Sequence, residues 1–201
     1  MGCSSGEDTK DGMAEHVCPV WAGYFLAHRL RRLLQNPSKI LAPYVRPGMT
    51  VLDVGSAMGY FSLPMAEMVG PSGRVVCVDV QPKMLQVLRR RAAEAGLAER
   101  IETHVSTDDS IGLSGWEESL DFALAFTMMH EVGNPAHFLR EIYQMLKPGA
   151  LLLLTEPIKH VSCADFDHTI SLAQQAGFIV TAHPLIRLSH TAVLMKPKEN
   201  Q

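Results

Sequence analysis

The run VLDVGSAMG at residues 51–59, followed twenty residues later by Asp79, decides how this chain folds. It predicts a short apolar strand over residues 49–54, a glycine-containing turn and a helix that begins near Tyr60. A second apolar strand, over residues 74–79, ends at Asp79. Glycines let a backbone approach a ligand closely, and an acid at the tip of the second strand accepts hydrogen bonds from ribose hydroxyls. The stretch therefore predicts the first half of a nucleotide-binding βαβ unit.

The spacing of the glycines separates two classes of nucleotide cofactor. Dinucleotide sites use the pattern G-x-G-x-x-G, in which a pyrophosphate rests on the N-terminus of the helix. Here the pattern is Asp53-x-Gly55-x-Ala57-x-Gly59. A carboxylate two residues before the first glycine repels a pyrophosphate but attracts an ammonium or sulfonium group. The spacing favours a cationic nucleoside cofactor, and the methyl group of Ala57 fits the turn if its φ is negative.

The turn at residues 53–59 resembles motif I, (D/E)-x-G-x-G-x-G, of the class I S-adenosylmethionine-dependent methyltransferases, with Ala57 in place of the middle glycine. Three further segments are similar to the ubiquinone/menaquinone C-methyltransferase-like (type 11) branch: DVQPKML at 79–85, LDFALAFTMMHEV at 120–132 and FLREIYQMLKPGA at 138–150. The resemblance covers about residues 40–196. It implies S-adenosylmethionine as the cofactor and S-adenosylhomocysteine as the product.

Alternating helices and strands predict an α/β fold with a parallel sheet covered on both faces. Helices are expected over residues 22–34, 37–44, 60–68, 82–95, 134–146 and 164–176. Strands are expected over residues 49–54, 74–79, 101–106, 120–126 and 150–155. The segments at 178–182 and 191–196 lie too close for a helical crossover, so they should pair antiparallel. The predicted fold is Rossmann-like, doubly wound and mostly parallel, with an antiparallel strand near the C-terminal edge; seven strands are implied by the resemblance.

The length of 201 residues predicts a single domain. We expect a disordered tail over residues 1–15, an N-terminal helical lid over 16–46 and the S-adenosylmethionine-binding domain over 47–197. In related methyltransferases the region before the sheet folds over the cofactor, which points to Trp21 and Tyr24 in the lid. Both side chains can equally pack a helix onto the sheet. An aromatic ring beside a sulfonium cation is physically favourable.

Composition bounds the partners and the compartment. Hydrophobic residues make up 47% and charged residues 19%, and no apolar run is long enough to span a membrane. A net charge of -3 gives no electrostatic reason to expect nucleic acid. The four cysteines lack the pair spacing of a metal site, which favours reduced thiols in a cytoplasmic protein and no metal. Oligomeric state cannot be inferred from these features.

Ligands of open α/β sheets bind beyond the carboxyl ends of the strands, so residues there are the site candidates. The cofactor-binding set expected from the resemblance is Tyr24, Asp53, Gly55, Ser56, Ala57, Gly59, Asp79, Val80, Met84, Thr107, Asp108 and Thr127. Either Thr107 or Asp108 is expected to contact the adenine. The expected catalytic residues are His130 and Glu131, and the expected substrate contacts are Trp21, Tyr24, His130, Glu156 and His160. A histidine or carboxylate at a strand tip can take a proton from the acceptor, but it can also cap a helix or meet solvent.

These expectations favour methyl transfer to a small molecule by in-line displacement at the sulfonium methyl group. One alternative is a protein that binds or senses S-adenosylmethionine without chemistry. Another is an arsenite-type methyltransferase, which would require converging thiols such as Cys18 and Cys163. A nicotinamide oxidoreductase is disfavoured by Asp53 and by the missing G-x-G-x-x-G pattern.

Overall fold

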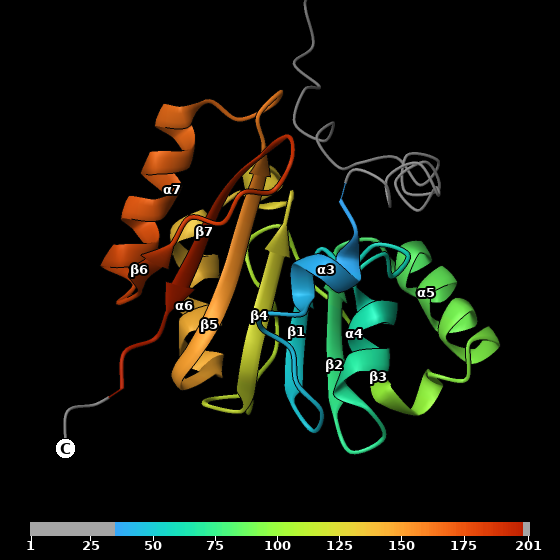
Figure 1. Cartoon of the computed structure of the whole chain (residues 1–201). Coiled ribbons are helices and arrows are strands. Elements are labelled where there is room, and N and C mark those ends of the chain that lie inside the picture. Colours follow the sequence, from blue (N-terminus) through green and yellow to red (C-terminus); the bar gives the residue numbers. More distant parts are fainter. Residues whose placement is uncertain (1–34, 199–201) are drawn as a thin grey trace, which may run out of the picture.

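The computed structural model describes residues 35–198, which form one seven-stranded sheet with helices on both faces (Figure 1). The strand order is β3-β2-β1-β4-β5-β7-β6. The strands are β1 (Thr50–Val54), β2 (Arg74–Asp79), β3 (Ile101–Val105), β4 (Leu120–Phe126), β5 (Leu146–Pro157), β6 (Ile179–Ala182) and β7 (Ser189–Met195). Strands β1 to β5 pair in parallel, and β7 runs antiparallel to both β5 and β6. The predicted fold class is confirmed, including the antiparallel strand near the C-terminal edge.

The helices follow the strands as the alternation predicts. They are α3 (Pro37–Leu41), α4 (Ser62–Val69), α5 (Pro82–Glu94), α6 (Pro135–Met145) and α7 (Cys163–Gln175), with short 3-10 turns η1 (Ala98–Arg100) and η2 (Met129–Glu131). Three of them begin with a proline, which has the φ of a helix and needs no hydrogen-bond acceptor at that position. Asn36, Asn134 and Ser162 cap α3, α6 and α7 by accepting a backbone N–H.

Two boundaries differ from the sequence expectation for identifiable reasons. The first helix after β1 begins at Ser62 rather than near Tyr60, because the glycine turn continues through residue 61. Strand β5 begins at Leu146, four residues earlier than expected. Pro148 disfavours a helical conformation at the residue before it, so α6 ends at Met145 and the chain becomes extended.

Two hydrophobic cores lie on the two faces of the sheet. Leu52 and Val54 of β1 face the core beneath α6 and α7, whereas Val51 faces the core beneath α3, α4 and α5. This alternation follows from the two-residue period of a strand. Leu41 and Val45, at the end of the expected lid segment, are buried in the second core. The predictions for Cys18, Trp21, Tyr24 and the helix at 22–34 lie outside the described residues.

The sheet changes direction of winding between β1 and β4, the two strands at its centre. The chain leaves β1 toward β2 and β3 on one side and leaves β4 toward β5 on the other (Figure 1). The loops after β1 and β4 therefore part from one another at the carboxyl edge of the sheet. Ligands of open α/β sheets bind in the crevice that such a reversal creates.

Candidate active site

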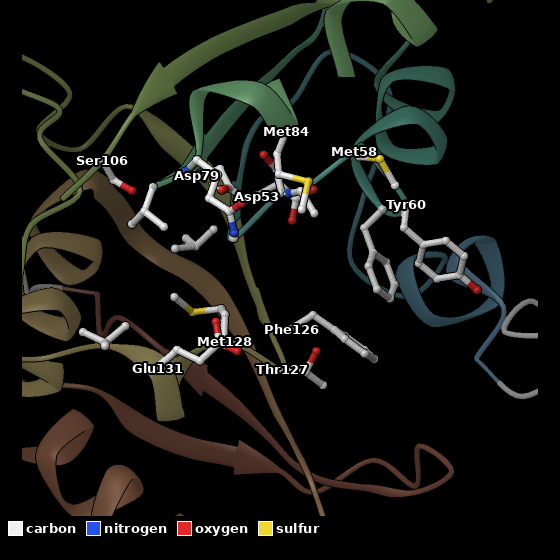
Figure 2. A pocket seen from close by; sticks show the side chains of 18 of the residues that line it. Asp53, Met58, Tyr60, Asp79, Met84, Ser106, Phe126, Thr127, Met128 and Glu131 are labelled. Atoms are coloured by element: carbon white, nitrogen blue, oxygen red, sulfur yellow. Dashed lines mark hydrogen bonds between the residues drawn. The ribbon is translucent and has the colours of Figure 1, made fainter. Parts of the chain in front are cut away.

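A cavity that is open to solvent lies at this reversal between the loops after β1, β2, β3 and β4. This is where an open α/β sheet is expected to bind a small molecule. Figure 2 shows Asp53, Asp79 and Met84 on one side of the cavity and Met128 and Glu131 on the other. The predicted site residues that line it are Asp53, Gly55, Ser56, Ala57, Asp79, Val80, Met84, Thr107, Asp108, Thr127 and Glu131.

The turn after β1 brings the backbone to the edge of the cavity. The N–H groups of Gly55 and Ser56 both donate to the carbonyl oxygen of Val78, at 2.9 and 3.0 Å, which joins the turn to β2. Gly55 has φ +70°, and a Cβ there would come within 2.9 Å of the Cβ of Met128 in the loop after β4. Only glycine therefore fits at position 55. The hydroxyl of Ser56 is buried at the cavity wall and has no hydrogen-bond partner among the described residues.

Ala57 adopts φ +45°, so the negative φ that would accommodate its methyl group comfortably is not present. A left-handed conformation costs an L-residue roughly 1–2 kcal/mol. The N–H of Ala57 donates to the Oδ2 atom of Asp79 at 2.8 Å, and this bond holds the residue in place. Asp79 thereby supports the turn as well as facing the cavity.

Gly59, expected to bind the cofactor, does not line the cavity. It has φ +83°, and a Cβ at this position would lie 2.2 Å from the Cδ1 atom of Leu88 on α5. The last glycine of the motif is therefore required by its left-handed backbone and by the close packing of α5 on the turn. Gly59 therefore has a packing role in this structure, and its expected contact with the cofactor stays a prediction.

Two buried carboxyl groups face the cavity from neighbouring strands. Asp79 is 8% exposed, and its Oδ1 atom accepts the N–H of Gln81 at 2.8 Å. Asp53 is 3% exposed, and its Oδ2 atom accepts the hydroxyl of Ser62 at 2.5 Å. Burial raises the pKa of Asp53 to about 7, with the nearby charge of Asp79 adding to the rise. Burial also raises the pKa of Asp79, although its two backbone hydrogen bonds oppose the shift. A cationic ligand would stabilise both ionised groups.

The loop after β3 forms the wall nearest Asp79. Both Thr107 and Asp108 line the cavity, so the geometry is compatible with either of them as the adenine contact. Glu141 of α6 holds this loop by accepting the hydroxyl of Ser110 at 2.7 Å and the N–H of Ile111 at 2.8 Å.

Aromatic side chains that were not expected in the site form the wall between the two central loops. Tyr60, Phe61 and Phe126 line the cavity, with ring centroids 5.2 Å apart for Tyr60–Phe61 and 4.3 Å for Phe61–Phe126. They directly follow the glycine motif and end β4, which was the available signal in the sequence. Other lining residues that were missed are Val54, Met58, Gln81, Ser106, Met128, Val132 and Phe138.

The end of β4 carries backbone strain at the cavity wall. Thr127 has φ +56°, although a β-branched residue strongly disfavours this conformation. Its N–H donates to the carbonyl oxygen of Thr155 on β5 at 2.8 Å. The strained residue turns the chain out of the sheet and leads directly into η2. Strained residues of this kind cluster at functional sites.

His130, Glu156 and His160 do not line the cavity. Glu156 is 1% exposed, and its carboxylate accepts the N–H of Met129 at 2.8 Å and contacts the Nδ1 atom of His130 in a short hydrogen bond. The Nε2 atom of His130 lies 3.9 Å from the Oε1 atom of Glu131, which does line the cavity. The rings of His130 and His160 are nearly parallel, with centroids 6.3 Å apart. The hydrogen bond to Glu156 raises the pKa of His130, burial lowers it, and the charges of Glu156 and Glu131 raise it further.

Comparison with known proteins fits this geometry. A family model described as a methyltransferase domain matches residues 46–183, well over half of the chain. The chain belongs to this methyltransferase family. A solved structure of an S-adenosylmethionine-dependent methyltransferase from Aquifex aeolicus superposes with a TM-score of 0.79 at 25% identity, over 90% of this chain and 100% of that one. The class I methyltransferase fold and its cofactor, S-adenosylmethionine, are thereby confirmed.

Two curated relatives of this methyltransferase have different methyl acceptors in their names. The ubiquinone/menaquinone biosynthesis C-methyltransferase UbiE of Brucella anthropi is 34% identical over 119 residues, which are 58% of this chain and 43% of that protein. The protein-L-isoaspartate O-methyltransferase of Triticum aestivum is 31% identical over 121 residues, 58% of this chain and 49% of that protein. The chain thus spans less than half the length of either relative. Among residues 35–198, no helix is long and apolar enough to cross a membrane.

Proposed function

We propose that this methyltransferase transfers the methyl group of S-adenosylmethionine to a small-molecule acceptor by in-line displacement. One observation carries the proposal. Asp53 and Asp79 are buried side by side at one cavity, and their only hydrogen-bond donors within residues 35–198 are neutral groups. Two such carboxylates repel each other and a phosphate, and a cationic nucleoside stabilises them.

Several residues of the cofactor set have positions that support a specific role. Asp79 keeps lone pairs on both oxygens after accepting two backbone N–H groups, so it can also accept the two ribose hydroxyls. Asp53 lies deeper and suits the ammonium group of the methionine part. The unpaired hydroxyl of Ser56 is available to a polar group of the ligand. Thr107 or Asp108 contacts the adenine, and Met84, at the start of α5, packs against the ring.

The reaction itself requires alignment more than activation. The bound cofactor supplies a reactive sulfonium methyl group. The residues of this chain hold the acceptor and the methyl group in line and exclude water, and such orientation contributes on the order of 7–11 kcal/mol. The rings of Tyr60, Phe61 and Phe126 provide an aromatic wall suited to a sulfonium cation.

The acceptor side of the cavity supports a small molecule with an apolar part. Met128, Val132 and Phe138 line the cavity together with the single carboxylate of Glu131. The net charge of -3 argues against a nucleic-acid acceptor. Cys77 and Cys163 carry free thiols, which supports a reducing compartment such as the cytoplasm.

We also propose that the segment over residues 16–46 acts as a lid of the cavity and carries Trp21 and Tyr24. The start of its described part, at Gln35, supports the idea. The backbone carbonyl of Gln35 accepts the hydroxyl of Tyr60, a cavity residue, at 2.8 Å. The side chain of Gln35 donates to the carbonyl oxygen of Arg187 at 3.0 Å. The chain therefore enters the domain at the rim of the cavity.

Calorimetric titration tests the proposal for the cofactor site. We expect S-adenosylmethionine and S-adenosylhomocysteine to bind, and NAD not to bind. Formation of S-adenosylhomocysteine during incubation with acceptor mixtures, followed by mass spectrometry, separates an enzyme from a non-catalytic binding protein. Binding of NAD in preference to the adenosyl compounds would overturn the proposal.

The lid has its own spectroscopic test. The chain contains two tryptophans, so Trp116→Phe leaves Trp21 as the single indole. We expect the fluorescence of this variant to change on titration with S-adenosylhomocysteine, and the matched Trp21→Phe variant to show no comparable change. The same signal change in both variants would contradict the lid.

A further inference from the structure

Glu156 and His130 form a pair that the cofactor site does not require. They come from different elements, β5 and η2, and neither side chain lines the cavity. Glu156 is 1% exposed, whereas the side chain of His130 is 28% exposed. A carboxylate is rarely buried to this extent unless its oxygens have donors. Glu156 is therefore held by its hydrogen-bond donors, and it in turn holds the more exposed His130.

The hydrogen bonds determine which nitrogen of His130 is engaged. Glu156 accepts the N–H of Met129 at one oxygen and contacts the Nδ1 atom of His130 at the other. An ionised carboxylate can only accept, so Nδ1 must carry the proton. In the neutral ring the lone pair then resides on Nε2, on the opposite side of the ring from Glu156.

The surroundings of the ring place Nε2 near a carboxylate of a residue that lines the cavity. Among the described residues, the titratable groups that face His130 are Glu156 from β5, Glu131 from its own turn and His160 from the loop after β5. The Oε1 atom of Glu131 is 3.9 Å from Nε2, and Glu131 lines the cavity. A proton on Nε2 would therefore be stabilised by a carboxylate at the cavity wall and by a second, buried one behind the ring.

We infer that Glu156 is a positioning residue that fixes His130 as a base, with Nε2 directed to the methyl acceptor. The methyl acceptor therefore carries a weakly acidic proton, as a phenol or an enol does. This inference rests on the proposed function. In the step, the acceptor atom forms a bond to the methyl carbon while the bond between sulfur and that carbon breaks. The electron pair of the broken bond stays on sulfur, which becomes a neutral thioether. The proton of the acceptor moves to Nε2, and the resulting imidazolium is stabilised by Glu156 and Glu131.

An acceptor of this class needs such a pair because its proton must leave as the methyl group arrives. A positioned base contributes roughly 10²–10⁴-fold when its pKa is near the working pH. The raised pKa of His130 brings the ring closer to that condition at neutral pH.

Nitrogen NMR of the full-length protein, labelled at its histidine rings, tests the inference without an acceptor. We expect neutral His130 to carry its proton on Nδ1 in the presence of S-adenosylhomocysteine. In Glu156→Gln we expect a lower pKa for His130 and a mixture of the two neutral forms. The matched control is Glu102→Gln, since Glu102 pairs with His104 at 2.7 Å on β3 and neither residue lines the cavity. A proton on Nε2 in the unmodified protein, or an unchanged His130 pKa in Glu156→Gln, would overturn the inference.

Turnover gives a second readout. Formation of S-adenosylhomocysteine is measured with a panel of simple phenols and 1,3-dicarbonyl compounds against secondary amines of similar size. We expect methylation of the protic oxygen or carbon acceptors, a fall of roughly tenfold to a hundredfold in kcat for Glu156→Gln with KM unchanged, and an acidic limb of the pH profile displaced to lower pH. Methylation of the amines alone, or a profile that Glu156→Gln leaves unmoved, would contradict the inference.

The failure of the inference can be distinguished from the failure of the proposed function. If S-adenosylmethionine does not bind, the proposed function is wrong. If it binds and is turned over while Glu156→Gln behaves as the unmodified protein, only the pairing of Glu156 with His130 as a base is wrong.

Discussion

Asp53 and Glu156 are both buried carboxyl groups at the carboxyl ends of central strands, yet their surroundings differ. Asp53, at the end of β1, has one hydroxyl donor and a like-charged neighbour in Asp79. Glu156, at the end of β5, has a backbone N–H and an imidazole as donors. Burial alone does not assign a role to an acid. The partners decide whether its charge is stabilised by the protein or awaits a ligand.

The same contrast separates the two sides of the cavity. The side built by β1 and β2 presents carboxylates to a cation, so its residues should govern affinity for the cofactor. The side built by β4 and β5 holds a histidine through a buried acid, so its residues should govern turnover. Variants on the two sides are expected to have different kinetic signatures.

The largest effect is expected from Asp79→Ala on the cofactor side. This substitution removes the carboxylate that is proposed to accept hydrogen bonds from the ribose hydroxyls. It also removes the hydrogen bond from the backbone N–H of Ala57, a residue with a positive φ. Hydrogen bonds to a charged group contribute about 1.5–3 kcal/mol each, so affinity for S-adenosylmethionine should fall by about a thousandfold. Calorimetry measures the change, with circular dichroism as a check on folding. Asp167→Ala, an exposed acid on α7, is the control. Unchanged affinity in Asp79→Ala would remove the distinction between the two sides.

On the acceptor side we expect His130→Ala to lower turnover by roughly a hundredfold, since a positioned base is lost. Binding of S-adenosylhomocysteine should stay unchanged, because Asp53 and Asp79, the proposed cofactor ligands, lie across the cavity from Glu131 of η2 (Figure 2). His137→Ala on α6, whose side chain is 45% exposed, serves as the comparison. Loss of cofactor affinity together with turnover would place His130 with the cofactor residues instead.

The pH dependence of cofactor binding tests the charge state of Asp53. Its pKa of about 7 in the free protein means that it is largely protonated at pH 6, whereas the cationic cofactor requires the ionised form. Affinity should therefore be about tenfold weaker at pH 6 than at pH 8. In Asp53→Asn this dependence should disappear, and affinity should be low at both pH values. A titration that is equally steep in Asp53→Asn would assign the proton to another group.

The raised pKa of Asp53 also predicts how the stability of the protein changes with pH. Its pKa rises from 3.8 to about 7 on burial, so the folded state holds a proton that the unfolded state releases between about pH 4 and pH 7. The contribution of this group to stability is present below about pH 4 and is lost as the pH rises to 7. Asp53→Asn should accordingly raise the Tm at pH 8 while it weakens cofactor binding. Thermal denaturation measures this, and a lower Tm in Asp53→Asn at pH 8 would contradict it.

The smallest effect is expected from Ala57→Gly. Glycine adopts φ +45° without the steric cost that alanine incurs, but it also gains freedom in the unfolded chain. The free energy of unfolding should rise by about 0.5–1 kcal/mol, measured by urea denaturation. Gly55→Ala is the matched opposite, because its Cβ would meet Met128 at 2.9 Å, and it should be destabilising. Stabilisation by both changes would show that the turn is not strained as described.

The sequence predicted the order of the elements and most of the cofactor side. Alternating hydrophobic patterns and the positions of prolines predicted the helices and strands, because both depend on residues close together in the chain. Thr107 and Asp108 line the cavity, as their position after β3 predicts, and their contact with the adenine stays a prediction. The motif did not reveal that Gly59 packs closely on α5, because that contact depends on how the helix lies on the turn. The aromatic wall was missed because its rings come from two segments, after β1 and at the end of β4, that only the folded sheet brings together.

By itself, the sequence determined that this is a doubly wound α/β methyltransferase with an acid at the end of each of its first two strands. Strand period, turn chemistry and the spacing from Asp53 to Asp79 are local properties, and local properties can be read along a chain. Only the tertiary structure decided that Glu156 lies beneath His130, 26 residues away, and that Thr127 turns out of the sheet with a positive φ. Those features depend on the pairing of β4 with β5, which brings together residues that no local pattern connects.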